Sequence, residues 1–180
     1  MRKALYIMGI LDDTDIEWLS QHGVHRTLEP GVVIIPEGVP VDSLFIVLEG
    51  VLQVYSGNLE IAKLQSGEIV GEISFVDSRP PLASVKAVVK SNVLAVNAEL
   101  LKTQLSKDTR FASRFYRAVA IFLADRLRVT TSRFGYGKGE QDTFEREDPD
   151  ELSEELLGSI DLATRRFDKL QRRFSTGTGG

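Results

Sequence analysis

The stretch from Gly71 to Val89 reads GEISFVDSRPPLASVKAVV, and it constrains the fold more than any other part of the chain. A Gly-Glu pair closes an apolar run, a short helix-capable piece follows, and a Pro-Pro pair ends that piece before a β-branched strand. Glycine lets a backbone approach a ligand closely, and small residues that open a strand leave backbone N–H groups accessible to an anion. The stretch therefore predicts the rim of a ligand pocket.

Short β-forming runs lie on both sides of this rim. Between residues 24 and 96 they read VHRTL, VVII, SLFIVLE, VLQVY, EIAKL, ASVKAVV and NVLAV. Glycine and proline separate the runs, and Gly57-Asn58 suits a tight hairpin. Strands this short, repeated at intervals of roughly 8–12 residues, are typical of an antiparallel barrel or sandwich.

Helical patterns flank the β-rich part. A first helix is predicted to begin at the cap-forming residues 12–14 and to end at Gly23. A short helix follows Asn97, and Asp108 can cap a longer one over residues 108–134. Its apolar stripe consists of Phe111, Phe115, Val119, Leu123 and Leu127, widened by Ala118, Phe122 and Val129. A stripe of this width predicts burial against the β-rich part, with a second helix or subunit covering the remainder.

The chain changes character after Phe134. Residues 135–139 read GYGKG, and residues 140–155 carry nine acidic residues against one arginine, which is typical of a solvated linker. A last helix is predicted over residues 149–174. Its apolar seam consists of Leu156, Ile160, Ala163, Phe167, Leu170 and Phe174, and its basic end of Arg165, Arg166, Lys169, Arg172 and Arg173. Basic residues there complement the helix dipole, or form a tip that docks on an acidic partner. We expect a main domain at 1–134, a linker at 135–148 and a helix with a tail at 149–180.

Composition excludes several classes of protein. The 180 residues carry a net charge of −4 and no cysteine, so neither a disulfide framework nor a thiolate metal site is expected, and nucleic acid is not an expected partner. No apolar run is long enough to span a membrane, and we expect a cytoplasmic protein. His22 and His25 are interpreted as surface residues, and no metal site is expected. No arrangement of nucleophile or acid and base indicates an enzyme.

The spacing of glycine and proline residues in the β-rich part resembles that of the cyclic nucleotide-binding domains of catabolite activator proteins and of cyclic-nucleotide-dependent kinase regulatory subunits. The resemblance covers roughly residues 9–134. Its turn glycines are Gly31, Gly38, Gly50, Gly67 and Gly71. The resemblance implies an α+β, mainly β fold, with an antiparallel jelly-roll-like β-roll, an N-terminal helix and two C-terminal helices. The chain would add one further C-terminal helix.

The same resemblance implies a ligand site. Glu72 matches the glutamate that accepts a ribose 2′-hydroxyl, and Gly71 matches the glycine beside it. Pro80, Ala83 and Ser84 match the proline, a small residue and the hydroxyl residue of the phosphate-binding cassette. The expected ligand-binding residues are Gly71, Glu72, Ile73, Ser74, Arg79, Leu82, Ala83 and Ser84.

The cassette departs from the family pattern at its cation. Pro81 stands where the family carries the arginine that pairs with the cyclic phosphate, and Leu82 replaces a small residue. Losing a charged hydrogen bond costs about 1.5–3 kcal/mol, and stranding a buried anion costs roughly 3–5 kcal/mol. Affinity for cAMP or cGMP is therefore expected to be lower by about a hundredfold or more. Arg79 lies two residues away and could replace the missing charge, or it could be a surface residue beside a turn.

Two functional hypotheses follow. The leading one is a stand-alone regulatory domain that binds a cyclic nucleotide or a related small phosphate ligand, and that signals through its C-terminal helices. The other is a degenerate domain that binds no nucleotide and acts as an interaction or assembly module. In both, a protein partner or a homodimer would use helices 108–134 and 149–174. Residues after Phe134 contain one predicted helix, so no helix-turn-helix and no DNA binding is expected.

Overall fold

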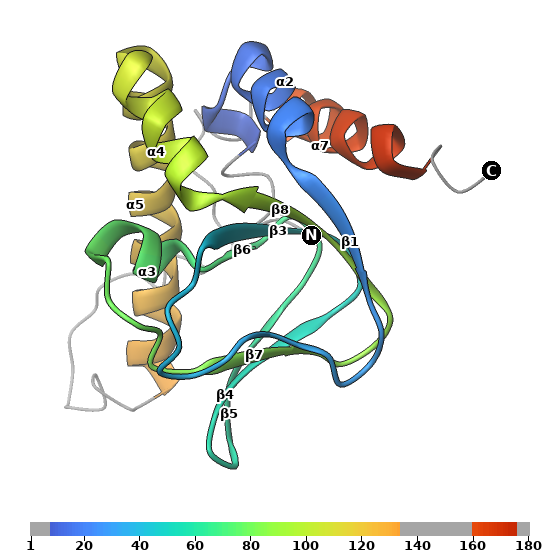
Figure 1. Ribbon diagram of the computed structural model, residues 1–180, viewed down its shortest axis with the longest axis vertical. Helices are drawn as coiled ribbons and strands as arrows, with labels where there is room; N and C mark the ends of the chain where they lie inside the picture. Colours follow the sequence, from blue (N-terminus) through green and yellow to red (C-terminus); the bar gives the residue numbers. More distant parts are fainter. Residues whose placement is uncertain (1–7, 134–159, 176–180) are drawn as a thin grey trace, which may run out of the picture.

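The computed structural model describes residues 8–133 and 160–175, which form two antiparallel sheets and a group of helices (Figure 1). The strands are β1 (Val24–Leu28), β2 (Val33–Ile35), β3 (Ser43–Glu49), β4 (Leu52–Ser56), β5 (Leu59–Leu64), β6 (Ile69–Val70), β7 (Ser84–Ala87) and β8 (Ser91–Asn97). One four-stranded sheet has the order β1-β8-β3-β6, and the other has the order β2-β7-β4-β5. The predicted mainly β fold with added helices is confirmed.

Strand β3 shows why the sequence forms a roll with two separate cores. Its side chains alternate between the two faces of the sheet, as in any strand. Leu44, Ile46 and Leu48 pack into a cluster shared with the helices, whereas Phe45 and Val47 pack into a second cluster between the sheets. Because both faces are covered, β3 is an unbroken apolar run with only its last residue exposed.

The helices are α2 (Asp13–His22), α3 (Glu72–Asp77), α4 (Ala98–Lys107), α5 (Thr109–Arg133) and α7 (Ile160–Ser175). Helices α2, α4 and α7 lie beside the β1-β8-β3-β6 sheet, and α5 runs along the roll past α3 (Figure 1). The predicted caps are confirmed at Asp12, where a capping box starts α2, and at Gly23, which ends it. Asp108 also starts α5 as predicted, because its carboxylate accepts hydrogen bonds from the backbone N–H groups of Arg110 and Phe111.

An ion pair joins the first half of α5 to α2. The Arg114 guanidinium donates from Nε and Nη2 to both carboxylate oxygens of Asp15, at 2.6 and 2.8 Å. Arg114 Nη2 also lies 2.8 Å from an Asp12 oxygen. The Asp15 side chain is only 1% exposed, so its charge needs this bidentate partner.

The predicted apolar stripe of α5 is correct over its first half and wrong at Leu127, while the side chain of Val129 lies outside the described part of the chain. Phe111, Phe115, Ala118, Val119 and Phe122 are buried, and Leu123 packs partly against the same cluster. Leu127, however, is 67% exposed. Beyond Phe122 the helix continues past α3 (Figure 1), and Leu127 belongs to neither of the two apolar clusters of the described residues.

Helix α7 packs back onto the N-terminal part of the domain. Ala163, Phe167 and Leu170 of the predicted seam are buried in the helix-side core. The side chain of Arg166 is 11% exposed and pairs with Asp13, while its Nη1 donates to the carbonyls of two residues before α2. Lys169 and Arg173 both pair with Glu17. These three basic side chains of the predicted basic end are therefore already paired with acidic residues of the same chain.

The strand and turn predictions compare closely with the structure. All seven predicted strands are present, and the two-residue strand β6 was not predicted. The five resemblance glycines all adopt a positive φ, as does Gly57 in the β4–β5 hairpin. The predicted linker at 135–148, the start of the last predicted helix at 149–159 and the tail at 176–180 lie outside the described residues.

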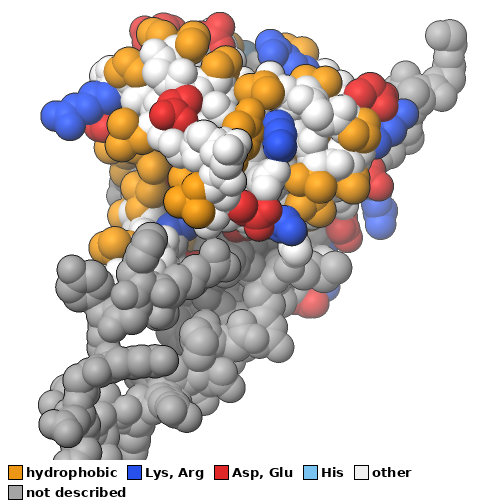
Figure 2. All heavy atoms as spheres, turned by 90° about the horizontal axis from the view of Figure 1, so that it is seen from below, with side chains coloured by type: hydrophobic (Ala, Val, Ile, Leu, Met, Phe, Trp, Pro, Cys, Tyr) orange, Lys and Arg blue, Asp and Glu red, His pale blue; other side chains and the backbone are white. Residues whose placement is uncertain are grey.

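The described surface carries mixed charge. On the face seen from below, Lys and Arg side chains alternate with Asp and Glu and with apolar side chains, and neither sign forms a continuous patch there (Figure 2). Within residues 8–133 and 160–175, no helix combines the length and the apolarity that crossing a membrane requires.

Gly71 and Gly31 provide a matched test of the turn before α3. Their φ angles are +90° and +89°, but a Cβ on Gly71 would lie 2.9 Å from the Ser43 carbonyl oxygen, whereas one on Gly31 would meet nothing within 4 Å. Gly31→Ala should therefore cost only the left-handed backbone strain, about 1–2 kcal/mol. Gly71→Ala should cost about 1–3 kcal/mol more through crowding against β3. Urea unfolding of both variants checks this, and equal losses would contradict it.

Candidate functional site

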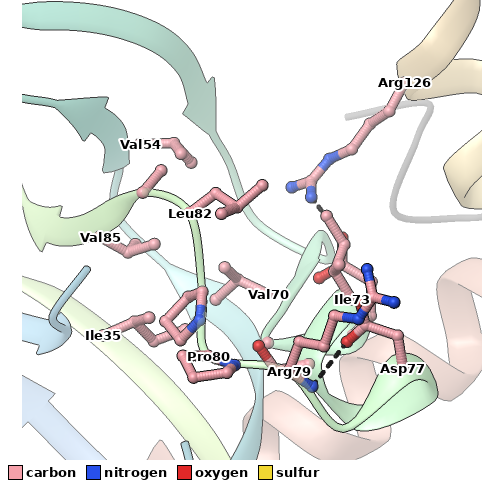
Figure 3. A pocket seen from close by; sticks show the side chains of 15 residues that line it. Ile35, Val54, Val70, Ile73, Asp77, Arg79, Pro80, Leu82, Val85 and Arg126 are labelled. Carbon is pink, nitrogen blue, oxygen red and sulfur yellow. Dashed lines mark hydrogen bonds and ion pairs between the residues drawn. The ribbon is translucent and has the colours of Figure 1, made fainter. Parts of the chain in front are cut away.

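A cavity of about 230 Å³ opens between α3, the Pro-Pro rim, the β2-β7-β4-β5 sheet and α5 (Figure 3). Its inner wall is apolar and is formed by Ile35, Val54, Val70 and Val85. Polar groups enter from one side only, where Figure 3 shows Asp77, Arg79 and Arg126 across from the apolar wall. The cavity has the composition of a small-molecule site, which is mostly apolar with a few placed polar groups.

Gly71 and Glu72 form the base of this polar side. Gly71 is the N-cap of α3 in a left-handed conformation, and it turns the chain from β6 directly into the helix. That turn places Glu72 in the first helical position, where an anion is favoured by the helix N-terminus. The side chain is nevertheless directed inward, and it is 1% exposed.

Arg126 of α5 is the partner of this buried carboxylate. Its Nη1 donates to Glu72 Oε1 at 2.5 Å, and its Nη2 donates to the Ile69 carbonyl at 3.3 Å. The guanidinium also lies 4.5 Å from the centre of the Phe122 ring. Three contacts from three parts of the chain therefore hold one cation at the edge of the cavity.

Burial raises the pKa of the Glu72 carboxyl above its ordinary value, because the charged form loses its contact with water. The Arg126 guanidinium lowers the pKa through charge and hydrogen bonding, and the nearby Glu68 carboxylate raises it. The net direction is upward. Glu72 is thus a carboxylate whose charge depends on its arginine.

The Pro-Pro rim is fastened to the loop after β2. The Pro81 carbonyl accepts a hydrogen bond from Gly38 N–H at 2.8 Å, and the Ser84 hydroxyl oxygen accepts one from Glu37 N–H at 2.9 Å. Leu82 stands at the rim with 90% of its surface exposed. The rim is therefore anchored in part through Ser84, whose hydroxyl the resemblance assigned to ligand binding.

Arg79 lies at the opposite side of the cavity from its apolar wall. Its backbone N–H donates to the Asp77 carboxylate at 2.9 Å, which stabilises the turn after α3. The side chain is exposed and runs beside Ile73, away from Ile35 and Val85 (Figure 3). Its charge is thus more hydrated than that of Arg126, whose side chain is 25% exposed.

The structure brings most of the expected site residues together. Gly71, Glu72, Ile73, Ser74, Arg79, Leu82 and Ala83 all line the cavity. Ser84 is not among the lining residues, because its hydroxyl is directed toward Glu37.

Sequence reasoning missed Arg126. A signal for it exists, because Arg126 follows the buried Ala118 and Phe122 at successive intervals of four residues and so shares their helix face. A cation on an apolar face indicates a buried acidic partner, but the sequence does not name that partner.

The histidines do not form a metal site with other described residues. His22 is exposed, its Nδ1 lies 2.9 Å from the Trp18 carbonyl oxygen, and its ring stacks on Trp18. No group of three or more His, Asp or Glu side chains with metal-binding geometry occurs within residues 8–133 and 160–175.

Comparison with known proteins gives one consistent result. Residues 25–108 match the family described as cyclic nucleotide-binding domain. The human cGMP-dependent protein kinase 2 is 24% identical over 107 residues, which is 59% of this chain but only 14% of the kinase. The chain thus corresponds to a small part of that curated relative.

Solved structures share the fold. A cyclic nucleotide-binding domain from Methylobacillus flagellatus KT superposes with a TM-score of 0.68 at 22% identity, covering 78% of this chain and 85% of that one. The N-terminal domain of a transcriptional regulator from Streptomyces coelicolor A3(2) has a TM-score of 0.55 at 25% identity, covering 72% and 90%.

The raised pKa of Glu72 predicts a pH-dependent effect of Glu72→Gln on stability. Between the ordinary pKa of 4.5 and the raised folded value, the folded state binds more protons than the unfolded state, so wild-type stability falls as pH rises. Glutamine has no such dependence. Relative to wild type, the variant should therefore gain up to about 1.4 kcal/mol per pH unit across this window.

Urea unfolding at several pH values from 4.5 upward measures this difference. Glu99→Gln, which removes an exposed carboxylate, is the control for loss of one charge. A wild-type protein that gains stability relative to Glu72→Gln as pH rises would show that the assigned direction is wrong.

Proposed function

Because residues 25–108 match the cyclic nucleotide-binding domain family, we propose that this chain is a regulatory sensor that takes a cyclic nucleotide or a related small phosphate ligand into the cavity beside α3. The proposal assigns a binding role and no catalysis. It places the sensor in the cytoplasm, with residues 1–134 as the sensing domain and the remainder as its extension.

One observation carries the proposal. Glu72, the residue that the family resemblance assigns to a ribose hydroxyl, lies in the wall of the cavity and is paired with Arg126 of α5. A ligand that contacts Glu72 therefore also alters the surroundings of α5. This supports signalling through that helix. A ligand shifts the equilibrium between two conformations of a protein only when it binds them with different affinities, and a contact that involves α5 can differ between two positions of that helix.

Titration with cAMP and with cGMP tests the proposal. We expect binding that is weaker than an intact cassette would give, since Pro81 supplies neither the family cation nor a backbone N–H. Bound ligand should raise the melting temperature, because stability grows with ligand concentration relative to the dissociation constant. Calorimetry and thermal melting provide the two readouts. No heat and no shift at millimolar ligand would overturn the proposal.

A second function is favoured by the anchoring of the rim. The Pro81 carbonyl and the Ser84 hydroxyl oxygen already have partners in the loop after β2, which suits a domain that no longer binds nucleotide. Such a domain would act as an assembly module. The exposed Leu127 and Tyr116 side chains of α5 offer apolar surface for a second copy or for another protein.

The assembly function predicts that Leu127→Glu weakens self-association. A charge in an apolar interface loses its hydration without gaining a partner. The oligomer of the variant should therefore dissociate at a higher protein concentration than the wild-type oligomer. Light scattering after size-exclusion chromatography measures the mass. Leu59→Glu is the control, because Leu59 is similarly exposed but belongs to the β4–β5 hairpin. A wild-type monomer at all concentrations would remove the homodimer from this proposal.

A further inference from the structure

Two arginines line the cavity, and their environments differ. Arg79 is exposed and lies along α3, where water screens its charge. Arg126 is one-quarter exposed and is fixed by Glu72, by the Ile69 carbonyl and by the Phe122 ring. An arginine held in advance loses less conformational freedom when a ligand arrives, so Arg126 is the better placed of the two cations.

Arg126 has donors to spare for a ligand. A guanidinium carries five N–H donors in a planar fork. Two hydrogen bonds from Arg126 to described residues are present, one from Nη1 to Glu72 and one from Nη2 to Ile69. The fork can therefore donate to an anion in the cavity without leaving Glu72, and the Glu72 charge need not be stranded.

Glu72 is matched to this arrangement. The Arg126 bond uses Oε1, and a carboxylate has a second oxygen that can accept a hydrogen bond from a ligand hydroxyl. The pair thus presents a hydroxyl acceptor and an anion donor side by side at the wall of one small cavity.

We propose that Arg126 supplies the cation that the rim lacks at Pro81, so that the ligand is a small anion with a neighbouring hydroxyl, held by its charge at α5. A ribose cyclic phosphate meets this description. The inference rests on the proposed function of the cavity, and it assigns the anion contact to a helix outside the cassette. Because that contact is made by α5 itself, a ligand that binds Arg126 would act directly on the helix through which we propose that the chain signals.

Titration of the full chain with cAMP and with adenosine, which has the ribose hydroxyls but no phosphate, tests the role of Arg126. Arg126→Gln should lower the affinity for cAMP by about 10- to 100-fold, which corresponds to one lost charge-assisted contact. The affinity for adenosine should stay within about twofold of wild type, since it makes no charge contact. Arg79→Gln should leave the affinity for cAMP within about twofold.

Two further variants separate the charge contact from the folding of the site. Glu72→Gln combined with Arg126→Gln leaves no unpaired buried charge. Loss of the Glu72 hydroxyl acceptor should lower the affinity for both ligands, while the preference for cAMP over adenosine should fall by the same factor as in Arg126→Gln. Arg114→Gln removes the other ion pair of α5, between that helix and α2, and should leave the preference for cAMP over adenosine unchanged.

The outcomes distinguish this inference from the function on which it rests. Wild-type protein that binds neither cAMP nor cGMP overturns the proposed function and the inference with it. Wild-type protein that binds cAMP, together with an Arg126→Gln variant that binds it equally well, overturns only the role of Arg126. Parallel losses of cAMP and adenosine, or a selective loss of cAMP in Arg79→Gln, also overturn that role.

Discussion

The Glu72 carboxylate, 1% exposed and paired with Arg126, is the constraint on which the site depends. An ionised carboxylate without water costs several kcal/mol unless a cation and hydrogen bonds replace the water. The replacement comes from α5, which begins more than 30 residues after α3 ends. The position of α5 along the roll and the charge state of the cavity are therefore linked through a single contact.

Helix α5 is held by two such contacts, one in each half. Arg114 pairs with the buried Asp15 of α2, and Arg126 pairs with the buried Glu72 of α3. Between them, apolar residues such as Phe115 and Phe122 pack into the helix-side core. The first half of α5 is thus fixed by both apolar packing and charge. Near Arg126 the core ends and Leu127 is exposed, so the charge contact carries a larger share of the attachment there.

The rim of the cavity is held in place by hydrogen bonds that involve no charged side chain. Pro81 offers neither a cationic side chain nor a backbone N–H, but its carbonyl fastens the rim to Gly38. Ser84 likewise keeps its place by accepting a hydrogen bond from Glu37 N–H. The cavity consequently retains its walls, and its charge lies with residues outside the Pro-Pro segment. Shape and charge are separable properties of this fold, because turns and apolar packing set the first and a few side chains set the second.

The sequence by itself determined seven of the eight strands, the turns and the caps, because each depends on residues close together in the chain. A run of consecutive apolar residues indicated β3, glycines marked the turns, and Asp12 and Asp108 marked the starts of their helices. Seven of the eight expected site residues line the cavity because they share one short segment. Only the tertiary structure brought Arg126 to Glu72 across an intervening 53 residues, and only it exposed Leu127 and directed the Ser84 hydroxyl away from the cavity. Such contacts depend on how helices and strands pack in space. Local sequence preferences do not specify which residues far apart in the chain will meet.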